Sequence, residues 1–271
     1  MIPKIIHYCW FGRNPLPKSA KNCINSWKRF LPDYEIKEWN EDNFDVNIVP
    51  YTAEAYKARK YAFVSDYARF WILSKYGGLY FDTDVEIIRP LDDIISRGSF
   101  MGCQNEVSTK QNTDVNPGLG LGLQVAPGLG IGLEEKEEKL SLLSHRLFEE
   151  LLNNYSNIHF INTDGSLNKK TIVTYTTELL VRDGLQPRNE IQCIDGIYIY
   201  PKEYFCPKDY PSGELHLTSN SRCIHHFDAT WLRVPIEQQL EARFWDSLGI
   251  NRHRLMWHLD NFLNKLGFKR Y

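Results

Sequence analysis

The amino-acid sequence predicts an α/β protein in which helices flank a mixed central sheet. The first observation is the alternation of elements near the N-terminus. Residues 5–12 form a nearly all-apolar run closed by Gly12, which is typical of a strand buried on both faces. Residues 19–30 place apolar side chains at helical spacing, and residues 34–39 alternate as a second strand. Strand, helix and strand at this spacing predict a right-handed crossover unit.

The second observation is the stretch at residues 60–90, around which the predicted chemistry is organised. A helix, a Gly77-Gly78 break and a strand follow one another, and the strand carries Asp82 and Asp84 at alternate positions. Because strand side chains alternate between faces, both carboxylates are expected on one face, roughly 7 Å apart. A divalent cation or a shifted pKa would relieve their repulsion. Asp-x-Asp alone is a weak signal, and an edge strand with a solvated carboxylate face explains the same spacing.

Size and composition indicate a protein of one or two domains and argue against a nucleic-acid-binding or membrane-spanning protein. At 271 residues the chain can form one large domain, or a domain with a helical appendage. A net charge of −2 gives no sign of a nucleic-acid-binding protein. The six cysteines include no Cys-x-x-Cys, which favours reduced thiols in a cytoplasmic chain. We expect no signal peptide and no membrane-spanning helix. Aromatic residues make up 13% of the chain, which suits a site that stacks on flat ligands.

A charge pair precedes the Gly-Gly break. Residues 53–76 are helical in composition, with a break near Ser65, which can act as an N-cap. Asp66 and Arg69 lie three residues apart and share a helix face. If exposed, they form a weak surface ion pair. Their apolar neighbours favour a second interpretation, in which the pair serves a polar ligand.

Three motifs together resemble a known family. They are Ile2-Pro3-Lys4-Ile5-Ile6-His7 with Trp10, then Ser65-Asp66-x-x-Arg69, then Tyr76-Gly77-Gly78-x-Tyr80-x-Asp82-x-Asp84. The combination resembles the DXD sugar-binding glycosyltransferases of family 32, which include yeast initiating mannosyltransferases and bacterial capsule enzymes and are distantly similar to the glucosylating clostridial toxins. The resemblance covers residues 1–105 and returns at 225–231. It implies a single Rossmann-like GT-A domain.

The resemblance implies a metal and a phosphate side of the site. Asp84 would coordinate Mn²⁺ or Mg²⁺ directly, and Asp82 would contact the ribose and the metal. A histidine after residue 224 would reach the metal, and we favour His226 over His225. Trp231 would donate its indole N–H to a diphosphate oxygen.

It also implies a sugar and a base side. Asp66 would accept hydrogen bonds from hydroxyls of the donor sugar, Arg69 would hold the sugar and diphosphate, and Tyr80 would pack beside them. Trp10 would stack on the base. The implied reaction is a metal-dependent transfer of a hexose, with retained anomeric configuration, from a nucleotide-diphosphate sugar to a saccharide hydroxyl. A UDP-sugar is favoured and GDP-mannose is possible. The acceptor would be a saccharide or lipid-linked saccharide of bacterial capsular or exopolysaccharide synthesis.

The rest of the chain is predicted from periodicity. We expect further strands at 100–104, 157–162 and 190–200, and helices at 134–154 and 171–183. The glycine-rich run at 116–133 lacks the spacing of a phosphate-binding loop and is interpreted as a strand and bend in the floor or rim of the site.

The C-terminal part is expected to be helical. Residues 1–235 would form the catalytic domain, and residues 236–271 a basic, amphipathic extension. This extension would either dock on the core or touch an anionic membrane surface.

Two rival functions remain open. Phe81-Asp82-Thr83-Asp84-Val85 also resembles the nucleophile motif of haloacid-dehalogenase-type phosphatases, although that motif belongs on a first strand. A non-catalytic sugar- or nucleotide-binding module, with the aspartates on Ca²⁺, would bind without releasing nucleotide.

Overall fold

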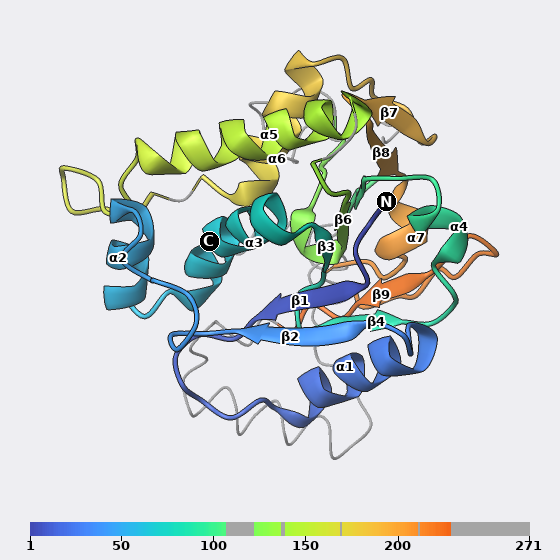
Figure 1. Ribbon diagram of the computed structural model, residues 1–271, viewed down its shortest axis with the longest axis horizontal. Coiled ribbons are helices and arrows are strands. Elements are labelled where there is room, and N and C mark those ends of the chain that lie inside the picture. The colour runs from blue at the N-terminus through green and yellow to red at the C-terminus, as the bar shows by residue number, and fades with distance from the viewer. Residues whose placement is uncertain (107–121, 137–138, 169, 211, 229–271) are drawn as a thin grey trace, which may run out of the picture.

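A seven-stranded mixed sheet forms the centre of the protein. The computed structural model describes residues 1–106, 122–136, 139–168, 170–210 and 212–228. The strand order is β2-β1-β3-β6-β5-β8-β7 (Figure 1). These strands are β1 (Ile5–Cys9), β2 (Glu35–Trp39), β3 (Gly78–Tyr80), β5 (Phe100–Gly102), β6 (Ile131–Leu133), β7 (Gln192–Ile194) and β8 (Ile197–Tyr200). β1 is parallel to β2 and β3, whereas β6 is antiparallel to β3 and β5, so the predicted mixed sheet is confirmed.

Helices cover both faces of this sheet. The longer helices are α1 (Lys18–Phe30), α2 (Pro50–Lys57), α3 (Tyr61–Tyr76), α5 (Lys139–Ser156) and α6 (Ile172–Arg182). Ile6 and Tyr8 of β1 join the apolar core under α1, whereas Cys9 joins the core under α3 and α5. Figure 1 shows α1 on one side of β1 and β2, with α3 and α5 on the other. Within the described residues, no helix is long and apolar enough to cross a membrane.

A small second sheet brings a distant segment to the first strands. It pairs β4 (Val85–Ile87) with the antiparallel strand β9 (Cys223–His225) (Figure 1). In this register His225 lies opposite Val85, directly after the two aspartates. The remaining short elements are α4 (Asp92–Ile95), α7 (Lys202–Phe205) and a 3₁₀ turn at Pro127–Leu129.

The predicted crossover elements are present. α1 buries Cys23, Ile24 and Trp27, and the Trp27 indole donates a hydrogen bond to the Val85 carbonyl oxygen at 2.7 Å. This contact fixes α1 against the start of β4. Helical periodicity located α1 correctly because its apolar stripe faces a single core.

Several other expectations were wrong in detail. Ser65 caps no helix: it lies inside α3, which begins at Tyr61, and its hydroxyl donates to the Tyr61 carbonyl oxygen at 3.2 Å. The helical segment is interrupted earlier, between α2 and α3, where Arg59 takes a positive φ of 58°.

The predicted strands after residue 150 also differ. Residues 157–162 form no strand, because the Phe160 side chain turns into the core against Tyr51, leaving one isolated bridge from Ile161 to Leu167. Residues 190–200 form a hairpin rather than one strand, since Asp195 and Gly196 both take positive φ between β7 and β8. The helix expected from residue 134 begins at Lys139. The predicted C-terminal extension lies outside the described residues.

His7 ties the first strands to the end of α3. Its Nδ1 accepts a hydrogen bond from the Trp39 indole at 3.1 Å, and Nε2 lies 3.2 Å from the Gly77 carbonyl oxygen. Burial lowers the pKa of His7 from 6.5 to about 4, against the raising effect of the Gly77 hydrogen bond. The ring is therefore neutral in the folded protein near pH 7.

This burial predicts acid sensitivity. Below pH 6.5 His7 is protonated in the unfolded chain but stays neutral in the folded protein until the pH reaches about 4. The folded state therefore loses stability as the pH falls from 6.5 to about 4. We expect His7 to account for up to about 3 kcal/mol of that loss. Chemical denaturation of the wild type and of His7→Asn across this range measures it. Equal pH slopes in the two proteins would contradict the assignment.

Candidate active site

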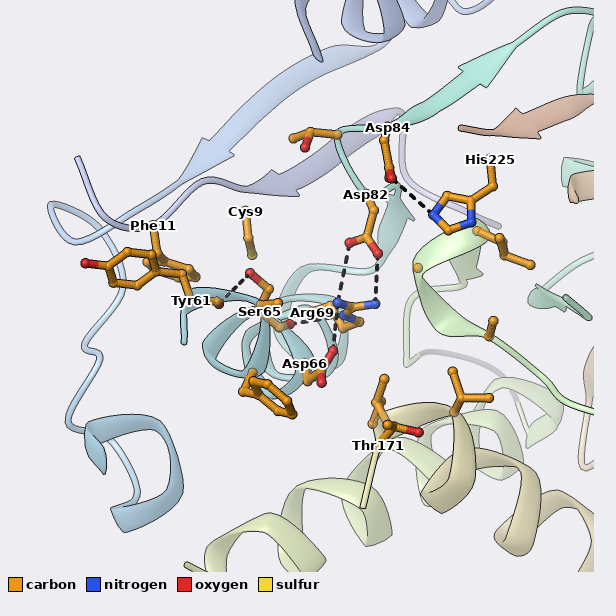
Figure 2. Close-up of a pocket in the computed structure, with 18 of the residues that line it drawn as sticks. Cys9, Phe11, Tyr61, Ser65, Asp66, Arg69, Asp82, Asp84, Thr171 and His225 are labelled. Atoms are coloured by element: carbon orange, nitrogen blue, oxygen red, sulfur yellow. Dashed lines mark hydrogen bonds and ion pairs between the residues drawn. The ribbon is translucent and has the colours of Figure 1, made fainter. Parts of the chain in front are cut away.

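One cavity collects most of the residues that the motifs predicted. It has a volume of about 320 Å³ and opens where β1 and β3 end. Its walls come from the end of β1, from α3, from the turn after β3, from the 3₁₀ turn, from the start of α6 and from β9 (Figure 2). The polar and charged lining includes Ser65, Asp66, Arg69, Asp82, Asp84, Gln104, Thr171 and His225.

Arg69 is the centre of a buried charge network. Nη2 donates to Asp66 Oδ1 at 2.9 Å, Nη1 lies 3.4 Å from Asp82 Oδ2, and Nε donates to the Ser65 carbonyl oxygen at 3.1 Å (Figure 2). The Arg69 and Asp66 side chains are only 5% and 12% exposed, so the surface ion pair is excluded. Burial opposes the charge on Arg69, but Asp82 and Asp66 outweigh it and raise its pKa.

Asp66 is the most deeply placed carboxylate of the cavity. Burial raises its pKa to about 7, against the lowering effect of Arg69. Buried polar groups need hydrogen-bond partners, and one side of Asp66 faces the cavity. It can therefore offer an acceptor to ligand hydroxyls.

Tyr80 supports the network from behind. Its hydroxyl donates to Asp82 Oδ1 at 3.0 Å, and its ring centroid lies 5.0 Å from the Arg69 guanidinium carbon. The side chain is 1% exposed and is not part of the cavity lining. The structure thus places Tyr80 where it positions Asp82, rather than where it touches a ligand.

The two aspartates lie in a turn and not on one strand. β3 ends at Tyr80, Thr83 and Asp84 form a turn, and β4 begins at Val85 in the other sheet. The same-face argument was therefore wrong, because the alternating pattern continues across a change of sheet. The turn nevertheless leaves both carboxylates in the cavity wall. Burial raises the pKa of Asp82, Arg69 lowers it, and the charge of Asp84 raises it further.

Asp84 holds the segment after β9. Its Oδ2 lies 3.3 Å from His225 Nε2 (Figure 2). The same oxygen accepts the Asp228 N–H at 3.1 Å. Its carbonyl oxygen accepts the His226 N–H at 2.9 Å. Burial would raise the pKa of Asp84, but the hydrogen bond and charge of His225 hold it below 3.8. Burial would lower the pKa of His225, and Asp84 with Cys206 raises it to about 10.

The structure places His225, and not the favoured His226, at the cavity. His226 Nε2 lies 2.8 Å from Glu86 Oε2, and neither residue lines the cavity. β9 ends at His225, and His226 follows it with its backbone N–H on the Asp84 carbonyl oxygen and its side chain beside Glu86. Trp10 does line the cavity, and its indole donates to the Asn14 carbonyl oxygen at 2.6 Å. The predicted Trp231 lies outside the described residues.

Gly128 is a site residue that the sequence did not single out. Its carbonyl oxygen accepts the Asp82 N–H at 3.0 Å. A Cβ at this position would lie 1.9 Å from Asp82 Oδ2 and 3.2 Å from Arg69 Nη1. Only glycine therefore lets the 3₁₀ turn close over the network. The sequence places the glycine-rich run in the floor or rim of the site, but its repeated glycines do not distinguish Gly128 from the others.

We expect Gly128→Ala to lower turnover at this cavity by about a hundredfold, because Asp82 must move aside by an ångström or more. The free energy of unfolding should fall by about 1–3 kcal/mol. Kinetics and denaturation of the variant measure both effects. Gly165→Ala is a control away from the cavity: unlike Gly128, Gly165 takes a positive φ of 82°, and nothing lies within 4 Å of the new Cβ. Unchanged turnover in Gly128→Ala would contradict this role.

The donor atoms suit a hard divalent cation. Asp82 and Asp84 provide carboxylate oxygens, and His225 provides an imidazole nitrogen beside them. Among the described residues, no three His, Cys, Asp or Glu side chains are grouped so as to hold a metal ion alone. Mg²⁺ and ions like it are commonly bound by one or two carboxylates together with substrate phosphates. The residues present therefore fit Mn²⁺ or Mg²⁺ bound jointly with a diphosphate.

The mixed sheet, the cavity at the strand ends and the paired aspartates beside a buried Asp–Arg pair agree with the resemblance to glycosyltransferases of the DXD type. Residues 17–101 match the family described as glycosyltransferase sugar-binding region containing DXD motif. The predicted resemblance to glycosyltransferase family 32 is confirmed.

Relatives agree with this class. Inositol phosphoceramide mannosyltransferase 3 of Schizosaccharomyces pombe is 35% identical over 102 residues, which are 35% of this chain and 27% of that protein. Inositol phosphoceramide mannosyltransferase 1 of the same yeast is 29% identical over 111 residues, 37% of this chain and 33% of that protein. The chain thus spans about a third of these yeast relatives. An uncharacterized glycosyltransferase, L373, of Acanthamoeba polyphaga mimivirus is 27% identical over 78% of both chains.

Solved structures are more distant. A glycosyltransferase involved in glycosylation of the major capsid of PBCV-1 aligns at a TM-score of 0.42 and 9% identity, covering 82% of this chain and 93% of that one. The galactosyltransferase LgtC aligns at 0.38 and 13% identity, covering 88% and 94%.

Proposed function

We propose that the protein transfers a hexose, with retained anomeric configuration, from a nucleotide-diphosphate sugar to a saccharide hydroxyl. The observation that carries this proposal is the cavity in which a buried Asp66–Arg69 pair lies beside the Asp82–Asp84 turn. At one end of the cavity, the Asp66 carboxylate can accept hydrogen bonds from a sugar, and the Arg69 guanidinium provides a fixed positive charge. The other offers carboxylates and a histidine to a metal diphosphate.

At the sugar end, Asp66 would accept hydrogen bonds from the donor hydroxyls. Arg69 cannot turn freely, because Ser65, Asp66 and Asp82 hold three of its nitrogens. A guanidinium fixed in this way holds positive charge where the donor's diphosphate meets the sugar, without reorganising during the reaction. Tyr80 keeps Asp82 in place.

At the diphosphate end, Asp84 and Asp82 would hold Mn²⁺ or Mg²⁺, with His225 in place of His226 as the adjoining nitrogen ligand. When bound, the cation supplies a Lewis acid that stabilises the charge of the leaving diphosphate. His225 and the Asp228 N–H fix the Asp84 carboxylate before the ion arrives. Binding of the ion by His225 requires the imidazole to give up its proton.

Retention is what the family resemblance implies, and the cavity bears on how it would be achieved. Among the cavity-lining residues that the structure describes, the carboxylates are Asp66, Asp82 and Asp84. Asp66 and Asp82 are bound to Arg69, and Asp84 is paired with His225. We therefore favour front-face substitution assisted by the leaving phosphate over a covalent sugar–enzyme intermediate.

The acceptor and location extend the proposal further. The acceptor would be a saccharide or lipid-linked saccharide, as in bacterial capsular or exopolysaccharide synthesis. The names of the yeast relatives add inositol phosphoceramide as a second acceptor to try. A cytoplasmic location, with contact to the inner membrane surface through residues 236–271, stays a prediction.

The phosphatase alternative receives less support. Its nucleophile would be Asp82, yet this carboxylate is bound by Arg69 and Tyr80 and follows the third strand of the chain. The nearby Asp93 pairs with Arg222, at 2.8 Å, outside the cavity.

A panel assay tests the proposal. The purified protein is incubated with Mn²⁺ and individual UDP- and GDP-sugars, with and without saccharide acceptors, and released nucleotide is measured. We expect release from one donor class, abolished by EDTA. Phosphate release from p-nitrophenyl phosphate instead would favour the phosphatase. Binding of sugar nucleotide without release under any acceptor condition would favour the non-catalytic module.

A further inference from the structure

A second cavity adjoins the first at Trp10. It has a volume of about 400 Å³ and shares Trp10 and Asn14 with the cavity described above. The rest of its lining is Arg13, Pro15, Glu38, Asn40 and Glu41. Trp10 directly follows β1, and Glu38 lies near the end of β2, so this cavity also opens at the carboxyl ends of parallel strands. Such ends are where ligands of open α/β sheets bind.

Two carboxylates of this cavity are held in fixed positions. Glu38 accepts hydrogen bonds from the Tyr8 hydroxyl at 2.6 Å and from the Asn40 amide at 2.9 Å. Glu41 accepts the Gly12 N–H at 2.6 Å and the Tyr56 hydroxyl at 2.9 Å. A carboxylate has about four lone-pair sites and can only accept. Each glutamate therefore keeps acceptor capacity for a ligand, and neither has to reorient to use it.

Trp10 connects this cavity to the diphosphate side. The side chain is half-buried, and its indole N–H is bound to the Asn14 carbonyl oxygen, which fixes the plane of the ring. A base stacked on Trp10 would have its edge in the second cavity and its diphosphate directed toward Asp84 in the first. Aromatic stacking of this kind tolerates any base. Hydrogen bonds to the edge of the base must therefore determine which base is bound.

We propose that the second cavity selects guanine, which makes the donor a GDP-sugar rather than the UDP-sugar that the motifs favoured. This inference rests on the proposed function. Guanine presents one ring N–H and one amino group beside a single carbonyl, whereas uracil presents one N–H between two carbonyls. Glu38 and Glu41 are matched to the guanine donors and repel the uracil carbonyls. Arg13 also lines this cavity; its Nη2 donates to Asp42 Oδ1 at 2.7 Å, and its remaining N–H groups can donate to the guanine carbonyl.

Nucleoside diphosphate binding tests this without any need for turnover. Dissociation constants of GDP, IDP and UDP are measured by calorimetry with Mn²⁺ present. IDP lacks only the amino group of GDP, so the GDP-to-IDP ratio isolates that contact. A hydrogen bond from an amino group to a carboxylate predicts GDP binding about tenfold or more tighter than IDP. UDP should bind weaker than GDP by at least the same factor.

The double variant Glu38→Gln with Glu41→Gln should bring the GDP-to-IDP ratio close to one, since an amide is a weaker acceptor and adds a donor. At position 41 the glutamine oxygen can still accept from both Gly12 and Tyr56, which share Oε1. At position 38 it can accept from Asn40, and the Tyr8 hydroxyl can turn to accept from the new amide, so the fold should hold. Glu35→Gln, on the exposed part of β2, is the matched control and should leave the ratio unchanged.

The outcomes separate this inference from the proposed function. Equal binding of GDP and IDP by the wild type, or tighter binding of UDP, overturns the base assignment, and release of UDP from a UDP-sugar would then leave the proposed function standing. No binding of any nucleoside diphosphate and no nucleotide release would overturn both. The wild-type comparison of the three nucleotides decides the matter even if the double variant fails to fold.

Discussion

Replacing Asp84 by alanine is expected to lower metal-dependent donor turnover by about a thousandfold, because the variant loses a carboxylate that would hold the cation beside the leaving diphosphate. Steady-state nucleotide release under saturating Mn²⁺ measures the loss. The same substitution also frees the Asp228 N–H and leaves His225 without its partner, so folding must be followed separately.

Two further variants separate chemistry from structure at this position. Asp84→Asn keeps an oxygen for the Asp228 N–H but removes the charge, and it should lose nearly as much activity as alanine. Glu86→Gln removes a carboxylate two residues away, whose partner His226 lies outside the cavity, and should stay within a fewfold of wild type. Wild-type transfer by a folded Asp84→Ala protein would show that the metal site has been misplaced.

Arg69→Met is expected to cause the largest loss of stability, about 3–5 kcal/mol at pH 7. The Arg69 side chain is 5% exposed and pairs with two carboxylates, so its removal leaves the buried Asp66 and the partly buried Asp82 beside each other without a cation. Their pKa values should then rise further. The deficit should shrink as the pH falls, because protonation of the two carboxyls removes the uncompensated charge.

Denaturant unfolding at pH 7 and at pH 5 checks both statements about Arg69. Arg69→Lys serves as the control: it restores one positive charge without the fork that reaches Ser65, Asp66 and Asp82 together, so it should recover part of the stability and little of the activity. If Arg69→Met lowers the free energy of unfolding by less than about 1 kcal/mol, the two carboxylates are solvated and the network does not stabilise the fold.

The fold was predicted best where an element packs one stripe of apolar side chains against a single core. Periodicity located β1 and α1 because each buries a continuous apolar face, and alternation located β2. The Gly77-Gly78 break located the end of α3. It failed at Asp82 and Asp84, where apolar alternation runs from β3 through a turn into β4, and the two strands belong to different sheets. Sequence alternation carries no information about which sheet a strand joins.

The site was predicted by residue type better than by geometry. Asp66 and Arg69 were recognised as a pair, but only their burial distinguishes a ligand site from a surface ion pair. The choice between His225 and His226 depended on the register of β9 with β4, which is set by contacts some 140 residues apart in the chain. Gly128 could not be chosen among its neighbouring glycines, since its role is the space it leaves for Asp82.

The most direct test is a crystal structure of the protein with Mn²⁺ and a non-hydrolysable sugar nucleotide, in which the anomalous signal of manganese locates the ion. We predict the ion within bonding distance of Asp84, between the carboxylate turn and the diphosphate, with the donor sugar against Asp66 and Arg69. Manganese and sugar nucleotide bound outside this cavity, or an ion without contact to either Asp82 or Asp84, would contradict the account.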